Sequence, residues 1–200
     1  MPFPGLRHPV PFVVAGLALA LVGLFATRRL LALRPETPLP VYGTVPVFDL
    51  TDERGALFPS SRLQGRPWIA DFVFTGCTDS CPLLTARMAE LQRRLPHARL
   101  VTFTVDPDRD SPARLLDYAH KAGADPVRWS FLTGPVDRLR ALVVHGFKLT
   151  MLRGDPSDRG EILHDNHLVL VDARGRIRGY YAADPHGANE IARDAAILGR

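Results

Sequence analysis

The residues of this chain that are best suited to chemistry are its only two cysteines, which lie in FVFTGCTDSCPLL, residues 72–84. Cys77 and Cys81 follow an apolar run and precede Pro82, a residue type that favours the first position of a helix. Thiols placed there face the positive end of the helix and its unpaired N–H groups, which lower a thiol pKa and favour the thiolate. Because both cysteines lie around one turn, their sulfurs can converge on one point.

Three uses of this cysteine pair remain open from the residues alone. A structural disulfide or two inert thiols would contribute little, because a disulfide stabilises most when it closes a long loop. A redox dithiol would resemble the C-x-x-C pair of thioredoxins with one more residue between the sulfurs. A metal site is the third use, since the wider spacing opens the sulfur pair enough to hold an ion.

A metal site usually needs a third ligand, and the chain has seven histidines. Five lie beside the apolar N-terminal stretch, on helices or in a polar turn: His8, His97, His120, His145 and His186. His164 and His167 lie in ILHDNHLVLVD, where a late hairpin begins. Residues three apart on a strand point to opposite faces, so only one of them can reach the cysteines. From the residues alone, a histidine here is more commonly a polar edge residue than a ligand.

Two thiolates with one imidazole suit copper, particularly Cu(I), which soft thiolate ligands select. Structural zinc usually takes four ligands, and no fourth is evident.

The elements around the cysteines predict an α/β fold. PWIADFVF is a continuous apolar strand, typical of the centre of a sheet that is covered on both faces. A helix from Pro82 would place Leu84, Met88, Leu91 and Leu95 on one face. A further strand is expected from residue 47 into a turn at 53–55. Others are expected at 99–105 and 129–134 and in a hairpin over 167–182, and further helices at 112–122, 136–144 and 189–198. This order is that of a thioredoxin-like domain with helices on both faces of its sheet.

Two other motifs have structural explanations. The acids of DPDRDSP, residues 106–112, suggest a hard-metal loop, but its prolines and Ser111 are better explained as a strand end and a helix cap. Gly123 would end that helix. We expect Trp129 to pack in the core.

The N-terminal part predicts a membrane anchor. Val10 to Thr27 has 18 residues without a charge, which is near the lower limit for spanning a hydrocarbon core of about 30 Å. A cleaved signal peptide is the alternative, but its apolar region is usually about 7–15 residues long, and no clear cleavage site follows. We expect an anchor over residues 1–33, a proline-rich tether over 34–44 and a domain over 45–200. The arginines on either side of the apolar stretch do not decide its orientation.

Charge argues against nucleic acid as a partner. The net charge is +4, but four of the basic residues lie before residue 43, leaving 21 basic and 20 acidic groups for the domain. No basic stripe with interleaved aromatic residues is present in the sequence.

Four segments, taken in order, resemble the Sco/SenC family of membrane-anchored, thioredoxin-fold proteins associated with copper delivery to cytochrome c oxidase. These are FTGCTDSCP, TVDPDRDSPARLLDY, WSFLTG and ILHDNHLVLVDARGRIRGYY, and the resemblance covers residues 45–181. It implies a central mixed sheet flanked by helices, with an N-terminal transmembrane helix.

The resemblance also implies a ligand set for copper, Cu(I) or Cu(II): Cys77, Cys81 and a histidine that opens the late hairpin. The family places this histidine eleven residues before the glycine of the hairpin turn, which selects His164 over His167. The chain departs from the family pattern at Thr78, where proline is frequent, and at Asp165, where serine or threonine is common. Neither departure removes a ligand, and the Asp165 carboxylate would either strengthen the basicity of the histidine from outside the ligand set or offer an extra oxygen donor.

The implied function is that of a metallochaperone that delivers copper to the binuclear copper site of cytochrome c oxidase subunit II. Such transfer is not catalysis in the usual sense. Because that site is loaded outside the cytoplasm, we expect a single-pass protein of the cell inner membrane whose domain faces the periplasm. The alternative is a membrane-anchored thiol–disulfide reductase that uses Cys77 and Cys81 as its catalytic pair, with His164 as a proton partner. Peroxidase chemistry is a third option.

Overall fold

A computed structural model describes residues 22–25, 38–77, 80–149, 151–152, 163–164 and 166–199 of the chain. It divides into two units, residues 1–38 and 39–200. In the first unit, residues 22–25 are helical, and the rest of the predicted anchor lies outside the described residues. Within the described part of the chain, no helix is both long enough and apolar enough to cross a membrane.

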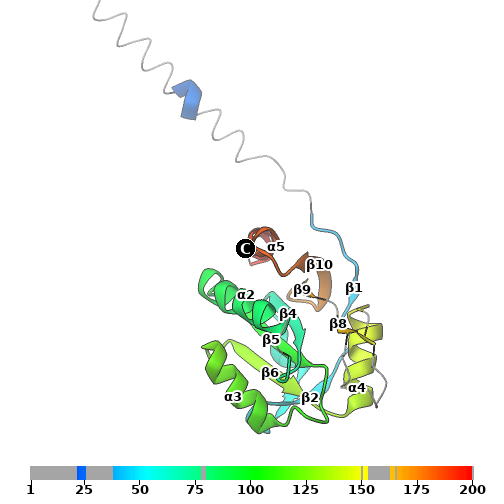
Figure 1. Ribbon diagram of the computed structural model, residues 1–200. Helices are drawn as coiled ribbons and strands as arrows, with labels where there is room; N and C mark the ends of the chain where they lie inside the picture. The colour runs from blue at the N-terminus through cyan, green and yellow to red at the C-terminus, as the bar shows by residue number, and fades with distance from the viewer. Residues whose placement is uncertain are drawn as a thin grey trace, which may run out of the picture. The chain divides into compact units, whose positions relative to one another are not determined.

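The second unit is built on a mixed sheet of eight strands, in the order β1-β10-β9-β4-β5-β6-β2-β3 (Figure 1). Three central strands, β4, β5 and β6, run parallel to one another, and the outer strands pair antiparallel. In sheet order the bounds are Gly43–Thr44, Arg176–Ala182, His167–Val171, Trp68–Val73, Arg99–Thr104, Trp129–Thr133, Asp49–Asp52 and Leu57–Pro59. Every residue of β4 is buried, as expected for a central strand.

Helices cover both faces of the sheet, which confirms the predicted layering. One face is covered by α2 (Ser80–Arg94), α3 (Pro112–Ala122) and α5 (Pro185–Leu198). On the other face lie α4 (Val136–Ala141), the π-helix η2 (Leu142–Gly146) and the 3₁₀ helix η1 (Ser60–Leu63). The predicted helix over 136–144 is therefore real but changes its hydrogen-bond pattern after Ala141.

Capping residues explain where the helices begin. Ser111 caps α3 by accepting from Arg114 N, Pro112 follows it, and Gly123 ends the helix in the left-handed region at φ 66°. Asp184 caps α5 by accepting from Gly187 N at 2.7 Å, so that helix begins four residues earlier than predicted. Helix α2 begins at Ser80, which makes Pro82 its third residue instead of its first.

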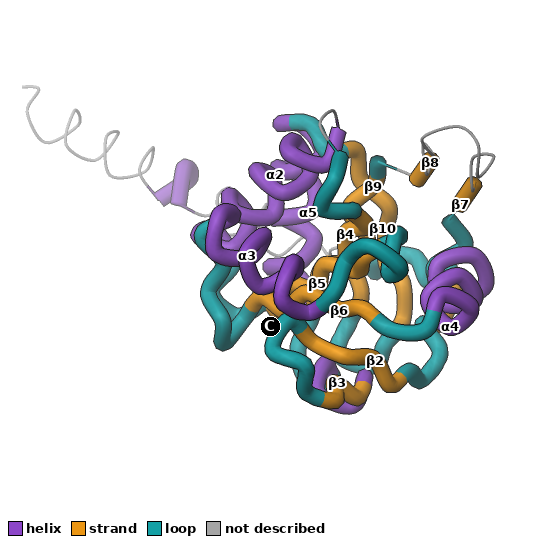
Figure 2. Tube along the Cα trace, turned by 60° about the horizontal axis from the view of Figure 1, so that its bottom comes forward, coloured by secondary structure: helices purple, strands orange, loops and turns teal. Residues whose placement is uncertain are grey.

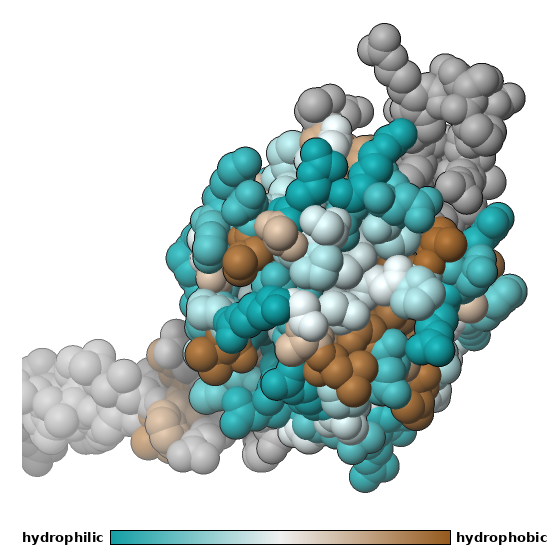
Figure 3. All heavy atoms as spheres, turned by 90° about the horizontal axis from the view of Figure 1, so that it is seen from below, coloured by the Kyte–Doolittle hydropathy of each residue, from teal (hydrophilic) through white to brown (hydrophobic). Residues whose placement is uncertain are grey.

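The core has one apolar cluster on each face of the sheet. Under α4, the rings of Phe72, Phe103 and Phe147 lie with centroids 4.9–5.5 Å apart. Under α2 and α3, Trp129 is 1% exposed, which confirms its predicted place in the core. Seen from below the view of Figure 1, the surface of the domain carries apolar side chains in patches separated by hydrophilic ones (Figure 3).

Residues 39–44, which we assigned to the tether, lie against the domain. Gly43 and Thr44 pair with β10, and the Arg178 guanidinium donates to the carbonyls of Leu39 and Pro40. Proline content alone therefore does not distinguish a free tether from an extended segment that is held by a sheet edge.

Candidate metal and redox site

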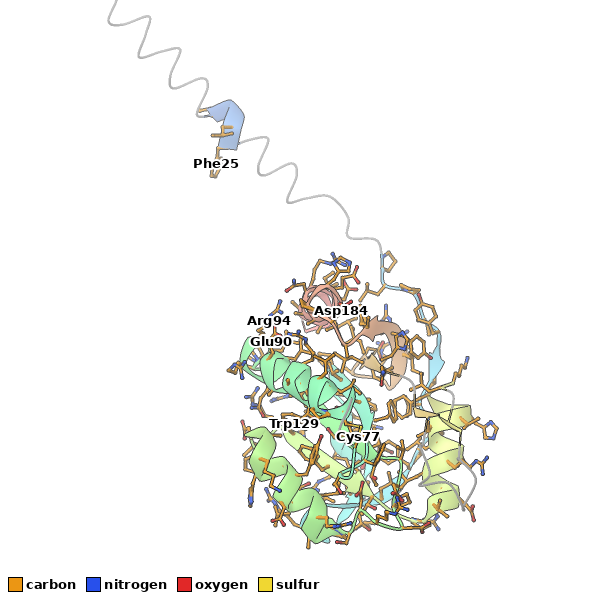
Figure 4. The ribbon with its side chains drawn as sticks, viewed as in Figure 1. Phe25, Cys77, Glu90, Arg94, Trp129 and Asp184 are labelled. Carbon is orange, nitrogen blue, oxygen red and sulfur yellow. The ribbon has the colours of Figure 1, made fainter. Side chains whose placement is uncertain are left out.

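The cysteine pair lies where the chain passes from the central strand to α2, as Figure 4 shows for Cys77. Strand β4 ends at Val73, Cys77 lies in the connecting turn, and Cys81 is the second residue of α2. Ligands of open α/β sheets bind beyond the carboxyl ends of the parallel strands, which is where this turn lies.

The two thiols differ in exposure: Cys77 is half-buried, whereas Cys81 is 0% exposed. The backbone N–H of Cys81 donates to Cys77 Sγ at 3.4 Å. This amide is among the first of the helix, which have no partner within it, and such donors favour a thiolate. For Cys77, the predicted interaction with the helix start is present.

For Cys81 the prediction of a lowered pKa is wrong. Burial raises the pKa of the Cys81 thiol far above its ordinary value, and the hydrogen bond with Cys77 and the charges of Cys77 and Asp71 raise it further. The helix start does not compensate, because the cluster under α2 removes Cys81 from water. The turn thus offers a half-buried Cys77 and a fully buried Cys81 whose raised pKa favours its protonated form.

A buried carboxylate, Asp110, holds the start of this turn. It is 1% exposed and accepts from Thr75 N at 3.0 Å, from Thr75 Oγ1 and, at 2.6 Å, from Thr104 Oγ1. These bonds fasten the residue two before Cys77 to the end of β5. Sequence analysis explained DPDRDSP as a strand end and a helix cap, and it missed that Asp110 holds Thr75. The one local signal for this role is an acid directly before the cap Ser111.

The two histidines of the late hairpin lie on different strands. The backbone of His164 belongs to β8 (Leu163–His164), which pairs with β7 (Met151–Leu152) in a separate two-stranded sheet (Figure 2). His167 opens β9 opposite Ala182. The assumption that both histidines share one strand is therefore wrong.

The imidazole of His164, together with Thr78 and Asp165, lies outside what the structure describes. Among the side chains that it does describe, no group of three or more His, Cys, Asp or Glu residues is arranged to hold a metal ion. Cys77 and Cys81 supply two soft donors in one turn, which fits copper. The complete set of Cys77, Cys81 and His164 stays a prediction.

A mixed sheet with parallel central strands, helices on both faces and two cysteines at a helix start defines a thioredoxin-like protein. The SCO1/SenC family model matches residues 39–198, and the chain belongs to this family.

Individual relatives agree with this assignment. A protein of Stutzerimonas stutzeri that is named for copper binding is 33% identical over 156 residues, and the match covers 72% of each chain. The crystal structure of a SCO1/SenC family lipoprotein from Bacillus anthracis str. Ames is 29% identical, with a TM-score of 0.75, covering 80% of this chain and 98% of that one. The structure of BsSco, described as a Sco family cytochrome c oxidase assembly protein with a disulfide switch, is 26% identical, with a TM-score of 0.71, covering 80% of this chain and 96% of that one.

Proposed function

We propose that this protein is a copper metallochaperone that hands copper to the binuclear copper site of cytochrome c oxidase subunit II. The observation that carries the proposal is the turn in which a half-buried Cys77 sulfur accepts a helix N–H beside Cys81. Membership of the SCO1/SenC family and the relatives named for copper binding and for oxidase assembly support it.

Copper is the cargo in this proposal. Cys77 and Cys81 give two thiolates and His164 an imidazole, and soft sulfur donors favour Cu(I). Because Cys77 is the accessible sulfur, an acceptor thiolate can approach the ion from its side while the weaker imidazole ligand leaves. Copper would then pass to the acceptor by exchange of one ligand at a time.

The proposal includes a location: an anchor over residues 1–33 in the cell inner membrane and a domain that faces the periplasm. A periplasm-dependent reporter fused to the carboxyl terminus should be active, and the same fusion to a cytoplasm-dependent reporter should not. The reverse pattern would contradict this location.

Copper retention by the full-length protein tests the ligand set. Reduced wild type should bind one copper per chain in competition with a Cu(I) chelator. His164→Ala should lower the affinity by more than about tenfold, because losing even a hydrogen-bond partner of a metal ligand typically costs about 10–100-fold. His167→Ala is the matched control, since it removes an imidazole three residues away, and it should retain wild-type affinity. Equal losses in both variants, or no copper in the wild type, would overturn the proposal.

A second function, thiol–disulfide exchange, is favoured by the difference between the two thiols. An accessible Cys77 can attack a disulfide, and a buried Cys81 can then resolve the mixed disulfide. The disulfide switch of the BsSco relative supports this alternative. His164→Ala separates the two functions, because a reductase needs only the cysteines and should keep its exchange rate in that variant.

A further inference from the structure

The side of the domain that carries α4 and η2 has a groove of its own. Its volume is about 480 Å³, which is within the usual range for binding sites. One wall is the segment 46–50, which leads into β2, and the other consists of four residues of α4 and η2: Arg138, Ala141, Leu142 and His145. None of the lining residues belongs to the cysteine turn or to α2. The groove is therefore a candidate site separate from the cysteine pair.

The backbone beside the groove has two irregular features. Leu142 and His145 lie in η2, and π-helical turns are rare and occur frequently at functional sites. Two residues after η2, Lys148 has a φ of 57°, which no other non-glycine residue in the described part of the chain shares in sign. Such a conformation persists only where the surroundings hold it, and here Lys148 Nζ donates to the carbonyl of Tyr42 at 2.7 Å. The wall that η2 forms is therefore held in an irregular shape.

The opposite wall offers an apolar side chain together with unpaired main-chain groups. Val47 is 90% exposed, more than any other large apolar residue that the structure describes. Its N–H and C=O have no hydrogen-bond partner among the described residues, whereas Phe48, the next residue, exchanges two hydrogen bonds with Ser60. Free main-chain groups beside an exposed apolar side chain are what a sheet edge offers to an added strand.

The charged side chains of the groove have both signs. Arg138 lies on the helical wall and Asp49 on the opposite wall, both are exposed, and neither side chain forms an ion pair or hydrogen bond within the described part of the chain. A fatty acid would bring an anion for Arg138 but would leave Asp49 facing a like charge. A peptide can bring an acidic side chain to Arg138 and main-chain N–H donors to Asp49. Charge complementarity therefore favours an acidic peptide segment.

We propose that this groove binds an extended segment of a partner protein. In the complex, an apolar side chain of the segment fills the space between the two walls, and an adjacent acidic side chain pairs with Arg138. The main chain of the segment pairs with Val47 and donates N–H groups to Asp49. This interaction goes beyond the proposed function and requires neither copper nor the cysteines.

The test is a methyl NMR titration of the copper-free full-length protein in lipid nanodiscs. The probe is an acetylated and amidated pentapeptide with a central leucine between two aspartates. NMR detects weak binding, and the titration should shift the methyl signals of Val47 and Ala141, on opposite walls, until they saturate. No shifts at millimolar peptide, or shifts that leave these two signals unchanged, would overturn the proposal.

Two arginine variants test the charge contact. Arg138→Gln should weaken peptide binding about two- to fivefold, which is the scale of an exposed ion pair. Arg140→Gln is the matched control, because Arg140 is an exposed arginine of the same helix that does not line the groove, and it should retain wild-type affinity. Both arginines are exposed, so neither substitution removes a core contact. Equal losses in the two variants would mean general attraction to a basic helix and would overturn the proposal.

Two further peptides and a fatty acid identify the occupant. A peptide with lysines in place of both aspartates should bind at least about fivefold more weakly. N-methylation of the central leucine removes its N–H donor and should weaken binding at least about twofold. Octanoate at equal concentration should not displace the peptide. Displacement by octanoate, or equal affinity for the three peptides, would overturn the proposal.

The same signals also test whether the groove binds a second copy of this chain. Without peptide, the methyl signals of Val47 and Ala141 should not change as the protein concentration is raised. A concentration-dependent shift of both signals would assign the groove to self-association and overturn the partner segment. Since no copper is present in any of these experiments, failure to bind copper would overturn the metallochaperone function and leave this inference standing.

Discussion

Two buried carboxylates on neighbouring parts of the sheet, Asp71 in β4 and Asp172 at the end of β9, have opposite electrostatic surroundings. Asp172 is 5% exposed and accepts from the N–H groups of Arg174 and Arg176 and from the guanidinium groups of Arg176 and Arg178. Asp71 accepts one hydroxyl and has one oxygen without a partner among the described residues.

The pKa values of the two acids follow from this difference. Burial favours the neutral form of both, but at Asp172 the Arg176 N–H and the Arg178 guanidinium outweigh burial and lower the pKa. At Asp71 burial prevails and raises it to about 7. The Asp172 carboxylate, which fixes a turn, has hydrogen-bond donors and guanidinium groups around it. The Asp71 carboxylate, in the cluster that contains Cys81, has one oxygen without a hydrogen-bond partner among the described residues. The contrast shows that hydrogen bonds and guanidinium groups, and not burial alone, decide whether a buried acid of this domain favours its charged or its neutral form.

The largest effect is expected from Asp172→Ala. It leaves the guanidinium of Arg178, whose side chain is 9% exposed, without its carboxylate, and removing one partner of a buried pair costs about 4 kcal/mol. Chemical denaturation at pH 7 should show this loss of unfolding free energy. Because the pKa of Asp172 is lowered, its contribution is present above its ordinary pKa and disappears as the pH falls through the folded value, so the cost should shrink in acid. A cost that is independent of pH would contradict the assigned ion pair.

Asp71→Asn should raise the free energy of unfolding above neutral pH, whereas Asp172→Ala lowers it. The folded pKa is raised from 3.8 to about 7, so wild-type stability is full below pH 3.8 and is lost as the pH rises to about 7. At 1.4 kcal/mol per pKa unit, removing the charge can stabilise the protein at pH 8 by at most about 4 kcal/mol, and we expect about 3. Denaturation curves at pH 4 and pH 8 should show the gain only at pH 8. A loss of stability at pH 8 would mean that the carboxylate is better satisfied than its contacts indicate.

Asp110→Asn tests the carboxylate that holds the cysteine turn. It weakens three hydrogen bonds to a charged acceptor, and we expect a loss of about 2 kcal/mol in unfolding free energy. Because Thr75 is then released, copper affinity should fall as well, which a chelator competition assay measures. Unchanged copper affinity with reduced stability would limit Asp110 to a structural role.

The smallest effect is expected for Glu90→Gln on the surface of α2. Glu90, labelled with Arg94 on α2 in Figure 4, contacts Arg87 and Arg94 at 2.9 and 2.8 Å. These groups lower the pKa of Glu90, but all three side chains are partly exposed. Surface ion pairs of this kind contribute less than about 1 kcal/mol and weaken with salt. Denaturation in low and high salt should show a small, salt-sensitive loss of unfolding free energy. A loss as large as that for Asp172→Ala would contradict the view that burial makes the Asp172 ion pair the stronger of the two.

Much of the fold follows from the sequence because local patterns specify it. The apolar run of β4, the spacing of Leu84, Met88 and Leu91 and the Ser111 cap each predict an element that the structure contains. These features depend only on residues that are close together in the sequence, so a short stretch of sequence is enough to predict the helix or strand.

The parts that sequence analysis missed depend on residues far apart in the chain. Thr75 meets Asp110 across 35 positions, and the burial that raises the pKa of Cys81 comes from packing between α2 and the sheet. Asp71 did leave a local signal, a single acid inside the apolar run WIADFV, but its pairing with Thr102 follows only from the strand register. Likewise, no pattern in the residues around His164 predicts that it lies in β8, which pairs with β7 in a separate sheet.

X-ray absorption at the copper edge of the loaded, reduced full-length protein tests the proposed ligand set most directly. Wild type and His167→Ala should both show two sulfur scatterers and one imidazole nitrogen, and His164→Ala should keep the sulfurs and lose the imidazole. An imidazole signal that persists in His164→Ala, or a copper environment without two sulfurs in the wild type, would contradict the proposed site.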